Sequence, residues 1–277
     1  RSVQSRVMDI LTANDRVRQY PTSYYAATAT PPAPFRHAAG DLKCDVCIVG
    51  AGYTGLSAAL HLSQAGFDVI LLDAHRVGFG ASGRNGGQVG TGQRVDQDAL
   101  EKMVGDIRAR ALWDMSLESV QLVRDLIKTH DIDCGFHDGI IHADHRERLV
   151  PHSHAYAEKL RDKYGYGLIK SLGRDEIRAL VGSDAYHGGT LDMGGGHIHP
   201  LRFAFGLTEA ASKSGVRIFE NSKVIEIAQT SPAKIRTDKA DITAGYVILA
   251  CNGYLGNLSP KVAARVMPIN NFILATE

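Results

Sequence analysis

Several features that would indicate other classes of protein are scarce or missing in this sequence. Its 277 residues contain no apolar run near the ~20 residues that a membrane-spanning helix needs, and no hydrophobic signal-peptide region at the start. Lys and Arg number 31 and Asp and Glu 30, so the net charge of +1 provides no basic field for nucleic acid. Four cysteines are too few for a disulfide scaffold. We therefore expect a cytoplasmic protein with no membrane span and no nucleic-acid partner.

Motifs of several catalytic chemistries are also missing or incomplete. The chain has no GxSxG nucleophile elbow and no GxxxxGK[ST] phosphate loop, which disfavours an α/β-hydrolase and a P-loop NTPase. Cys44 and Cys47 have the spacing of a redox or zinc pair. Because side chains three residues apart in a strand are expected on opposite faces, we expect neither a shared metal nor a ready disulfide. His197 and His199 form half a metal site that nothing nearby completes, so no bound metal is expected.

The sequence does contain the pattern of a β-α-β unit. With 44% hydrophobic and 22% charged residues, the chain can bury a large core. Apolar runs at 44–49 and 67–72 are typical of parallel strands that are covered on both faces. Between them, residues 54–65 have the Ala- and Leu-rich periodicity of a helix that ends at Gly66.

The turn between the first strand and this helix carries the run Gly50-Ala51-Gly52-Tyr53-Thr54-Gly55. In a GxGxxG turn, the first glycine permits the tight bend, the second lets the backbone approach a pyrophosphate, and the third lets the helix pack on the strand. The helix N-terminus offers N–H groups and a partial positive charge to the phosphates. Asp73, after the second strand, is placed to accept hydrogen bonds from ribose hydroxyls and to repel a 2′-phosphate. These residues predict a dinucleotide of the NAD or FAD kind.

The rest of the chain predicts a mixture of helices and strands. Residues 1–40 are expected to form an irregular arm. Residues 98–129 predict a helix bent near Gly105. Its expected buried stripe consists of Leu112, Met115, Ser119, Leu122 and Leu126. The later segments are expected to form a strand at 136–143, a helix at 153–164, a glycine-rich loop at 182–196, a helix at 200–214, a strand at 216–219, an antiparallel meander at 223–243 and a parallel strand at 246–250.

Residues 73–88, with the sequence DAHRVGFGASGRNGGQ, resemble the second flavin-binding segment of the glycine oxidase / D-amino-acid oxidase (DAO) family of FAD-dependent oxidoreductases. The γ-glutamylputrescine oxidase-like group of that family shows the same SGRNGG run, a similar Ser-Tyr-Tyr arm and a similar GxGYTGLSAALHL helix. Glycines here let the chain pass close to a flat ring, and Arg84 and Asn85 offer hydrogen-bond donors. The resemblance continues at 194–201, 223–224 and 250–254.

This resemblance implies an FAD cofactor and an α/β fold class, in which an FAD/NAD(P)-binding, two-dinucleotide-binding Rossmann-like domain is interrupted by an α+β substrate domain. The expected domains are an arm at 1–40, a discontinuous FAD-binding domain at 41–130 and 191–258, and an incomplete part of the substrate domain at 131–190 and 259–277. The expected cofactor-binding residues are Gly50, Ala51, Gly52, Tyr53, Thr54, Gly55, Asp73, Ala74, Arg76, Gly80, Ala81, Ser82, Arg84, Asn85, Gly86, Gly87, Gln88, Val224, Ala250, Asn252 and Gly253.

The resemblance further implies oxidation of a C–N bond in an amine or amino acid, with a γ-glutamylputrescine-like amine favoured. Hydride would move to flavin N5, the imine would hydrolyse, and oxygen or another acceptor would reoxidise the flavin. The expected partners are therefore a small amine or amino acid and an electron acceptor. No catalytic residue is assigned, because hydride transfer needs only a neutral amine and the substrate contacts of the family lie largely beyond Glu277.

Three alternatives stay open. The chain could belong to an amino-acid dehydrogenase or a sarcosine- or glycine-type oxidase that passes electrons to another acceptor. It could also be a non-catalytic nucleotide-binding fragment or subunit that another chain completes. An NAD-dependent dehydrogenase comes third, because it would not need the segment at 84–87. Members of the family continue well past the position of Glu277, so we expect the chain to be C-terminally incomplete.

Overall fold

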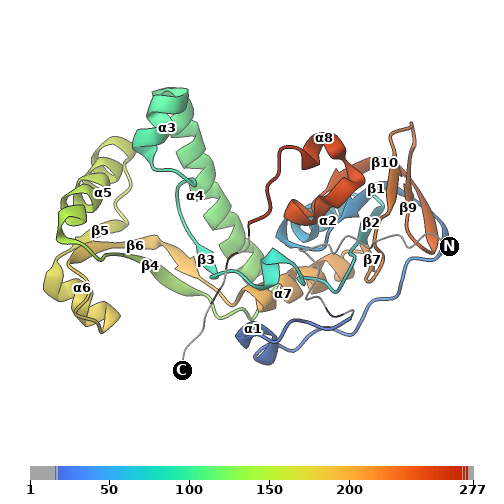
Figure 1. The fold of residues 1–277 in the computed structure, drawn as a ribbon, viewed down its shortest axis with the longest axis horizontal. Coiled ribbons are helices and arrows are strands. Elements are labelled where there is room, and N and C mark those ends of the chain that lie inside the picture. Colours follow the sequence, from blue (N-terminus) through green and yellow to red (C-terminus); the bar gives the residue numbers. More distant parts are fainter. Residues whose placement is uncertain (1–15, 17, 270, 272, 274–277) are drawn as a thin grey trace, which may run out of the picture. The chain divides into compact units, whose positions relative to one another are not determined.

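The computed structural model describes residues 16, 18–269, 271 and 273, and it divides the chain into two compact units (Figure 1). The first unit consists of Arg1–Gly86 and Pro200–Glu277, and the second consists of Gly87–His199. Each unit has its own sheet and its own helices, and the α/β fold class is confirmed.

The first unit is built on a six-stranded sheet with the order β7-β2-β1-β10-β9-β8. Its strands are β1 (Gly40–Val49), β2 (Val69–Leu72), β7 (Arg217–Phe219), β8 (Glu226–Ala228), β9 (Ala233–Arg236) and β10 (Ala240–Leu249). Strands β7, β2, β1 and β10 run parallel to one another, and the β10–β9 and β9–β8 pairs are antiparallel. The predicted β-α-β unit and meander are therefore confirmed. The four residues of β2 are all buried, as expected for a parallel strand that is covered on both faces.

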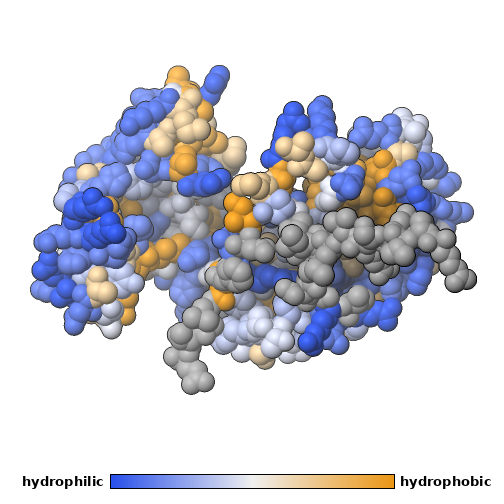
Figure 2. All heavy atoms as spheres, viewed as in Figure 1, coloured by the Kyte–Doolittle hydropathy of each residue, from blue (hydrophilic) through white to orange (hydrophobic). Residues whose placement is uncertain are grey.

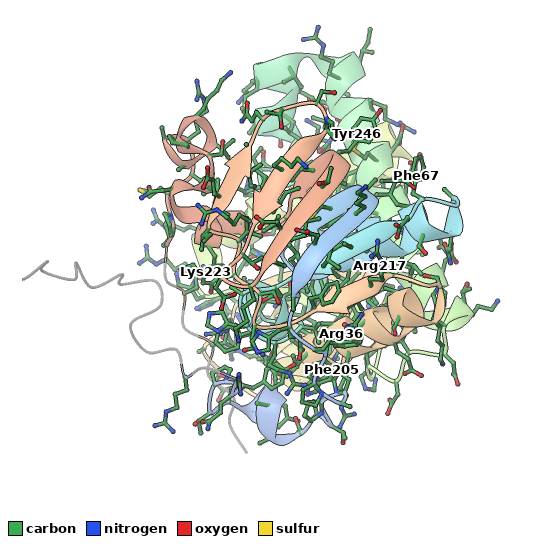
Figure 3. The ribbon with its side chains drawn as sticks, turned by 90° about the vertical axis from the view of Figure 1, so that its right-hand side faces the viewer. Arg36, Phe67, Phe205, Arg217, Lys223 and Tyr246 are labelled. Atoms are coloured by element: carbon green, nitrogen blue, oxygen red, sulfur yellow. The ribbon has the colours of Figure 1, made fainter. Side chains whose placement is uncertain are left out.

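Two helices of the first unit pack against each other, α2 (Tyr53–Gln64) and α7 (Pro200–Lys213). Helix α2 buries Leu56, Ala59 and Leu60, the apolar positions that its periodicity indicates. The same unit contains α1 (Tyr24–Ala27), η1 (Ala81–Gly83), η3 (Asn252–Leu258) and α8 (Pro260–Ala263). On β10, Tyr246 is 70% exposed (Figure 3), although its partner on β1, Val46, is 3% exposed.

The arm expected at 1–40 is described in part, since residues 1–15 and 17 lie outside the described residues. Where it is described, it has the single helical turn α1 and otherwise no regular element before β1. Ser23 caps this turn, because its Oγ accepts from the N–H of Ala26 at 3.2 Å. Arg202 of α7 holds this turn in place, because its Nη2 donates to the carbonyl oxygen of Thr28 at 2.6 Å.

The second unit is a four-stranded antiparallel sheet in which β6 is central. Its strands are β3 (Gln88–Val89), β4 (His137–Asp144), β5 (Ile169–Leu172) and β6 (Gly188–His197). Its helices are α3 (Gln97–Val104), α4 (Asp106–Thr129), α5 (Val150–Tyr164), α6 (Arg174–Val181) and the short η2 (Glu147–Leu149). The predicted break near Gly105 is confirmed, because this residue has a φ of +80° between α3 and α4.

The expected glycine-rich loop at 182–196 is wrong for most of its length, because strand β6 occupies Gly188–His197. Its glycines mark close approaches of backbone rather than a loop. A Cβ on Gly189 would lie 1.9 Å from the carbonyl oxygen of His142, and one on Gly196 would lie 2.5 Å from the ring of Phe136. Local sequence does not reveal these neighbours, so the composition alone indicated a loop.

The expected buried stripe of α4 is also wrong for most of its members, although Leu126 is buried as expected. Met115 and Leu122 are 59% and 43% exposed, while Trp113 is 1% exposed and packs against Tyr164 and Tyr166. Figure 2 shows further hydrophobic residues on the surface over α3 and the start of α4. The helix is apolar on more than one side, and the aromatic cluster around Trp113 decides which side is buried.

The units divide the chain at different places from the expected domains. Both α3 and α4 belong to the second unit, in which Trp113 of α4 packs against Leu160 and Tyr164 of α5. The described residues from 259 onward fall in the first unit. The assignment of the units to FAD binding and substrate binding remains a prediction.

The expectation that Cys44 and Cys47 lie on opposite faces of their strand is wrong. Leu42 and Cys44 pack against the same core cluster that contains Cys47 and Val49, so the side of the strand that faces the core changes between 44 and 47. The cause is an irregularity at the next residue, where the N–H groups of Asp45 and Val46 both donate to the carbonyl oxygen of Asp68, at 2.9 and 3.1 Å.

Candidate functional site

The glycine turn after β1 has the geometry that a dinucleotide-binding turn requires. Gly50 has a φ of +109°, and a Cβ on it would lie 2.6 Å from the carbonyl oxygen of Ala250. A Cβ on Gly55 would lie 1.9 Å from the carbonyl oxygen of Gly50, so α2 can pack on the strand only because this residue has no side chain. The first and third glycines therefore build the turn itself.

Gly52 plays a different part, because its conformation does not require glycine. It lies at the N-cap of α2 with a φ of −88°, and a Cβ on it would meet only Ser82, 2.7 Å from Oγ and 3.6 Å from Cβ. The same Oγ accepts a hydrogen bond from the N–H of Tyr53 at 3.0 Å. The first turn of a helix has N–H groups without intrahelical acceptors, so this end of α2 is suited to an anion that comes close to the backbone.

Asp73 is brought to this turn by β2, as the sequence predicts. Its Oδ2 accepts from the N–H of Ala51 at 2.7 Å, and its Oδ1 accepts from the N–H of His75 at 2.8 Å. Loss of hydration on burial raises the pKa of the Asp73 carboxyl to about 6, against the two backbone hydrogen bonds, which lower it. Additional donors such as ribose hydroxyls would stabilise the charged carboxylate that this environment disfavours.

The second glycine-rich segment folds back against the first. The N–H of Gly78 donates to the carbonyl oxygen of Ala51 at 2.9 Å, and a Cβ on Gly83 would lie 2.1 Å from the carbonyl oxygen of Gly78. Arg84 donates through Nε and Nη2 to the carbonyl oxygen of Phe79 at 3.0 and 2.6 Å, and Asn85 donates through Nδ2 to that of Ser82 at 3.0 Å. These two side chains hold the segment in its compact form, a role that the sequence did not indicate.

Arg76 is placed differently from the expectation for a cofactor ligand. Its side chain is directed into a buried ion pair, in which Nε lies 2.9 Å from Oε1 of Glu220, and its Nη2 donates to the carbonyl oxygen of Pro32 at 2.7 Å. Its guanidinium is thus engaged within the protein. The part of Arg76 that a cofactor could use is its backbone.

Glu220 is a buried residue beside the candidate site that the sequence reasoning missed. Its side chain is fully buried and accepts from the backbone N–H of Val77 at 2.9 Å and of Phe35 at 3.0 Å, in addition to Arg76. It thereby joins the arm to the segment that follows Asp73. A signal was present, because Glu220 follows strand β7 directly, just as Asp73 follows β2.

The remaining expected residues of the first unit lie on neighbouring loops. Ala250 follows β10 and its N–H donates to the carbonyl oxygen of Val49 at 2.8 Å, which places it against the glycine turn. Val224 is 4% exposed and belongs to the core cluster that lines β1 and β2. Asn252 and Gly253 lie in η3, where Asn252 has a φ of +46°.

Gly87 and Gln88 lie at the start of the second unit. The carbonyl oxygen of Gly87 accepts from the N–H of Ile198 at 2.9 Å, and Gln88 pairs with His197 across β3 and β6. The other expected residues, Thr54, Ala74, Gly80, Ala81 and Gly86, lie on α2 and on the segment that follows Asp73, all in the first unit. A cofactor-binding role for any of these residues remains a prediction.

Together, the turn, the open helix end and Asp73 fit one end of a dinucleotide. The close approach at Gly52 suits a pyrophosphate, and Asp73 suits a ribose that carries free hydroxyls. Among the described residues, no group of three or more His, Cys, Asp or Glu side chains is arranged to hold a metal ion. In the same part of the chain, no helix combines the length and the apolar character needed to cross a bilayer.

The class of protein follows from comparison with known families. Residues 45–277 match the family described as "DAO: FAD dependent oxidoreductase". The chain belongs to this family, and FAD is the cofactor that this family uses.

Two relatives of known sequence are similar over most of the chain. The chain is 44% identical over 260 residues to gamma-glutamylputrescine oxidoreductase of Escherichia coli (strain K12). This match covers 94% of this chain and 61% of that protein. It is 42% identical over 255 residues to a probable oxidoreductase OrdL of Rhizobium meliloti (strain 1021), covering 92% of this chain and 60% of that protein. The chain thus spans less than two thirds of the length of these relatives.

Solved structures share the fold. The glycine oxidase of Geobacillus kaustophilus matches with a TM-score of 0.64 and 22% identity, over 80% of this chain and 58% of that chain. The L-amino acid deaminase of Proteus myxofaciens matches with a TM-score of 0.67 and 19% identity, over 83% of this chain and 49% of that chain. At these identities the similarity supports the fold and no particular substrate.

Proposed function

We propose that the protein oxidises the C–N bond of an amine or amino acid, and that its substrate is an amine of the γ-glutamylputrescine kind. The observation that carries this proposal is the 44% identity to gamma-glutamylputrescine oxidoreductase over nearly the whole chain. The glycine turn and Asp73 support it, because they provide the dinucleotide site that such a reaction requires.

When bound, FAD would supply the acceptor for the hydride and would pass the electrons on to oxygen or another acceptor, and the imine product would hydrolyse in water. The residues of this chain bind and orient. The N–H groups at the start of α2 would neutralise pyrophosphate charge, and the Asp73 carboxylate, which accepts from the N–H of Ala51, would hold the ribose. The ion pair of Arg76 with Glu220 keeps the segment after Asp73 against the core.

The chemistry needs a neutral amine, because a protonated nitrogen has no lone pair to support loss of hydride from the neighbouring carbon. We assign no residue of this chain to the removal of that proton. Rate should therefore rise with pH toward the pKa of the bound amine, whatever group receives the proton.

The proposal is tested by purifying the protein and assaying peroxide formation under air with γ-glutamylputrescine, putrescine, glycine, sarcosine and a D-amino acid. We expect tightly held FAD, released on denaturation, and turnover of γ-glutamylputrescine above the others. Turnover only when an artificial electron acceptor replaces oxygen would identify a dehydrogenase. Turnover of glycine or sarcosine alone would refute the substrate assignment.

A further inference from the structure

We propose that the N-terminal arm is part of the flavin site and that Tyr20 is its positioning residue. The Tyr20 hydroxyl orients the peptide group between Val77 and Gly78. That peptide group in turn holds the carbonyl oxygen of Ala51 in the glycine turn. This inference rests on the proposed dinucleotide site at the turn, and it adds a residue that the glycine motif does not contain.

One peptide group connects the arm with the glycine turn. Oη of Tyr20 donates to the carbonyl oxygen of Val77 at 2.8 Å. The N–H of Gly78, which belongs to the same peptide group, donates to the carbonyl oxygen of Ala51 at 2.9 Å. Because a peptide group is planar, these two bonds fix one orientation of a single rigid unit. The N–H of Ala51 donates to Oδ2 of Asp73 at 2.7 Å, so consecutive hydrogen bonds link the arm to the carboxylate proposed to hold the ribose.

The side chain of Tyr20 is itself held in one place. Its ring packs edge-on against Phe205 of α7 (labelled in Figure 3), with 5.6 Å between the ring centroids. The guanidinium carbon of Arg76 lies 5.3 Å from the centroid of the same ring, which is the geometry of a cation–π contact. Burial raises the pKa of the Tyr20 phenol, so its hydroxyl keeps its proton and stays a donor at neutral pH.

Two further contacts join the arm to the segment that contains Val77. The carbonyl oxygen of Pro32 accepts from Nη2 of Arg76 at 2.7 Å. The N–H of Phe35 donates to Oε2 of Glu220 at 3.0 Å, and Oε1 of the same carboxylate accepts from the N–H of Val77 at 2.9 Å. These contacts hold the arm where it has no regular secondary structure. Attachment of the arm and the orientation of Val77 therefore depend on each other.

This dependence gives the arm an effect on cofactor affinity. When the arm detaches, the Val77 carbonyl loses its donor, and the peptide group that holds Ala51 is fixed on one side only. Fewer molecules then have the glycine turn in its binding form, and the apparent affinity for FAD falls by that fraction. Coupling of this kind is reciprocal, so bound FAD should also hold the arm more firmly.

The first test measures binding of FAD to the deflavinated protein by flavin fluorescence, alongside thermal unfolding of the apoprotein. Tyr20→Phe keeps the ring contacts and removes only the hydroxyl, and it should weaken FAD binding about fivefold. Tyr20→Ala also removes the contacts with Phe205 and Arg76, and it should weaken binding about thirtyfold.

Ser63→Ala is the matched control, because it also deletes a half-buried hydroxyl that donates to a backbone carbonyl. Oγ of Ser63 donates to the carbonyl oxygen of Ser214 at 2.6 Å, and Ser63 lies near the C-terminal end of α2, away from the glycine turn. It should lower the melting temperature of the apoprotein about as much as Tyr20→Phe does, and leave FAD binding unchanged. A purely structural role of Tyr20 would make the two variants alike in both measurements.

The second test follows hydrogen exchange in the unaltered protein with and without FAD, so it decides the question even if a variant does not fold. The peptide 33–39 contains the N–H groups of Phe35 and Ala38, which donate to Glu220 and to Oγ of Ser222. We expect FAD to slow exchange there more than in the reference peptide 60–66 at the end of α2.

The possible failures of the arm and of the site can be told apart. If the wild-type protein binds no FAD, the dinucleotide site is refuted and this inference with it. If the wild-type protein binds FAD and Tyr20→Phe binds it as tightly as Ser63→Ala, only the role of the arm is overturned. Equal protection of the two peptides by FAD would overturn that role as well.

Discussion

The three glycines of the turn have different structural roles, so a substitution at one of them can test nucleotide binding without preventing folding. Gly50 and Gly55 are needed by the backbone itself, whereas a methyl group on Gly52 would meet only the side chain of Ser82. We therefore predict that Gly52→Ala combined with Ser82→Ala yields a folded protein that no longer retains FAD.

The magnitudes follow from the contacts. Removal of the Ser82 Oγ eliminates the 2.7 Å contact and leaves a Cβ–Cβ distance of 3.6 Å, which is ordinary packing. It also removes the hydrogen bond from the N–H of Tyr53, worth about 1 kcal/mol. A φ of −88° suits alanine, so the backbone adds no strain. The stability loss should be about 1–2 kcal/mol, including the poorer N-cap that alanine provides.

The effect on FAD should be larger than the effect on stability. The added methyl group keeps the backbone from approaching the pyrophosphate, and loss of that approach should weaken binding at least a hundredfold, or by about 3 kcal/mol. The assay is titration of deflavinated protein with FAD, followed by flavin fluorescence, alongside thermal unfolding of the apoprotein. Ser82→Ala alone is the matched control.

Two outcomes would refute this reasoning. If the double variant binds FAD as tightly as Ser82→Ala, the pyrophosphate does not approach Gly52. If the double variant fails to fold while Ser82→Ala folds, the space beside Gly52 is not open as described. Gly55→Ala is expected both to lose FAD binding and to destabilise the apoprotein, because its Cβ would lie 1.9 Å from the carbonyl oxygen of Gly50.

Further predictions concern acid–base behaviour, the buried ion pair and strand β6. We propose that Asp73 binds ribose as a carboxylate, and its pKa is raised to about 6. The FAD affinity of the apoprotein should therefore fall by up to tenfold per pH unit as pH drops below about 6, and Asp73→Asn should flatten this profile. The apoprotein itself should lose stability as pH rises from about 4 to 6, since protonated Asp73 is favoured in the folded state. Glu220→Gln should cost about 3 kcal/mol in chemical denaturation because it leaves buried Arg76 without its counterion; a loss no larger than that of an exposed pair would contradict its role. Gly189→Ala should lower the melting temperature sharply, because its Cβ would lie 1.9 Å from the carbonyl oxygen of His142. An unchanged melting temperature would contradict this close contact between β6 and β4.

The nucleotide turn could be predicted because its determinants are adjacent in the chain. Strand, turn, helix and second strand occupy residues 44–73, and each requirement is a local one of periodicity, glycine placement or a terminal acid. The break at Gly105 was equally local. The alternation rule failed at Cys44 and Cys47, because the irregularity between them depends on the carbonyl oxygen of Asp68 on the neighbouring part of the sheet.

By itself, the sequence determined the first β-α-β unit, the glycine turn and the acid that faces it. Only the tertiary structure decided that Glu220 anchors Arg76 and the arm, that the glycines at 188–197 form a strand, and that Trp113 selects the buried side of α4. The physical reason is the distance along the chain between the residues that interact. Backbone conformation and periodicity are properties of neighbouring residues, whereas burial, ion pairing and close backbone contact depend on residues that only the folded chain brings together.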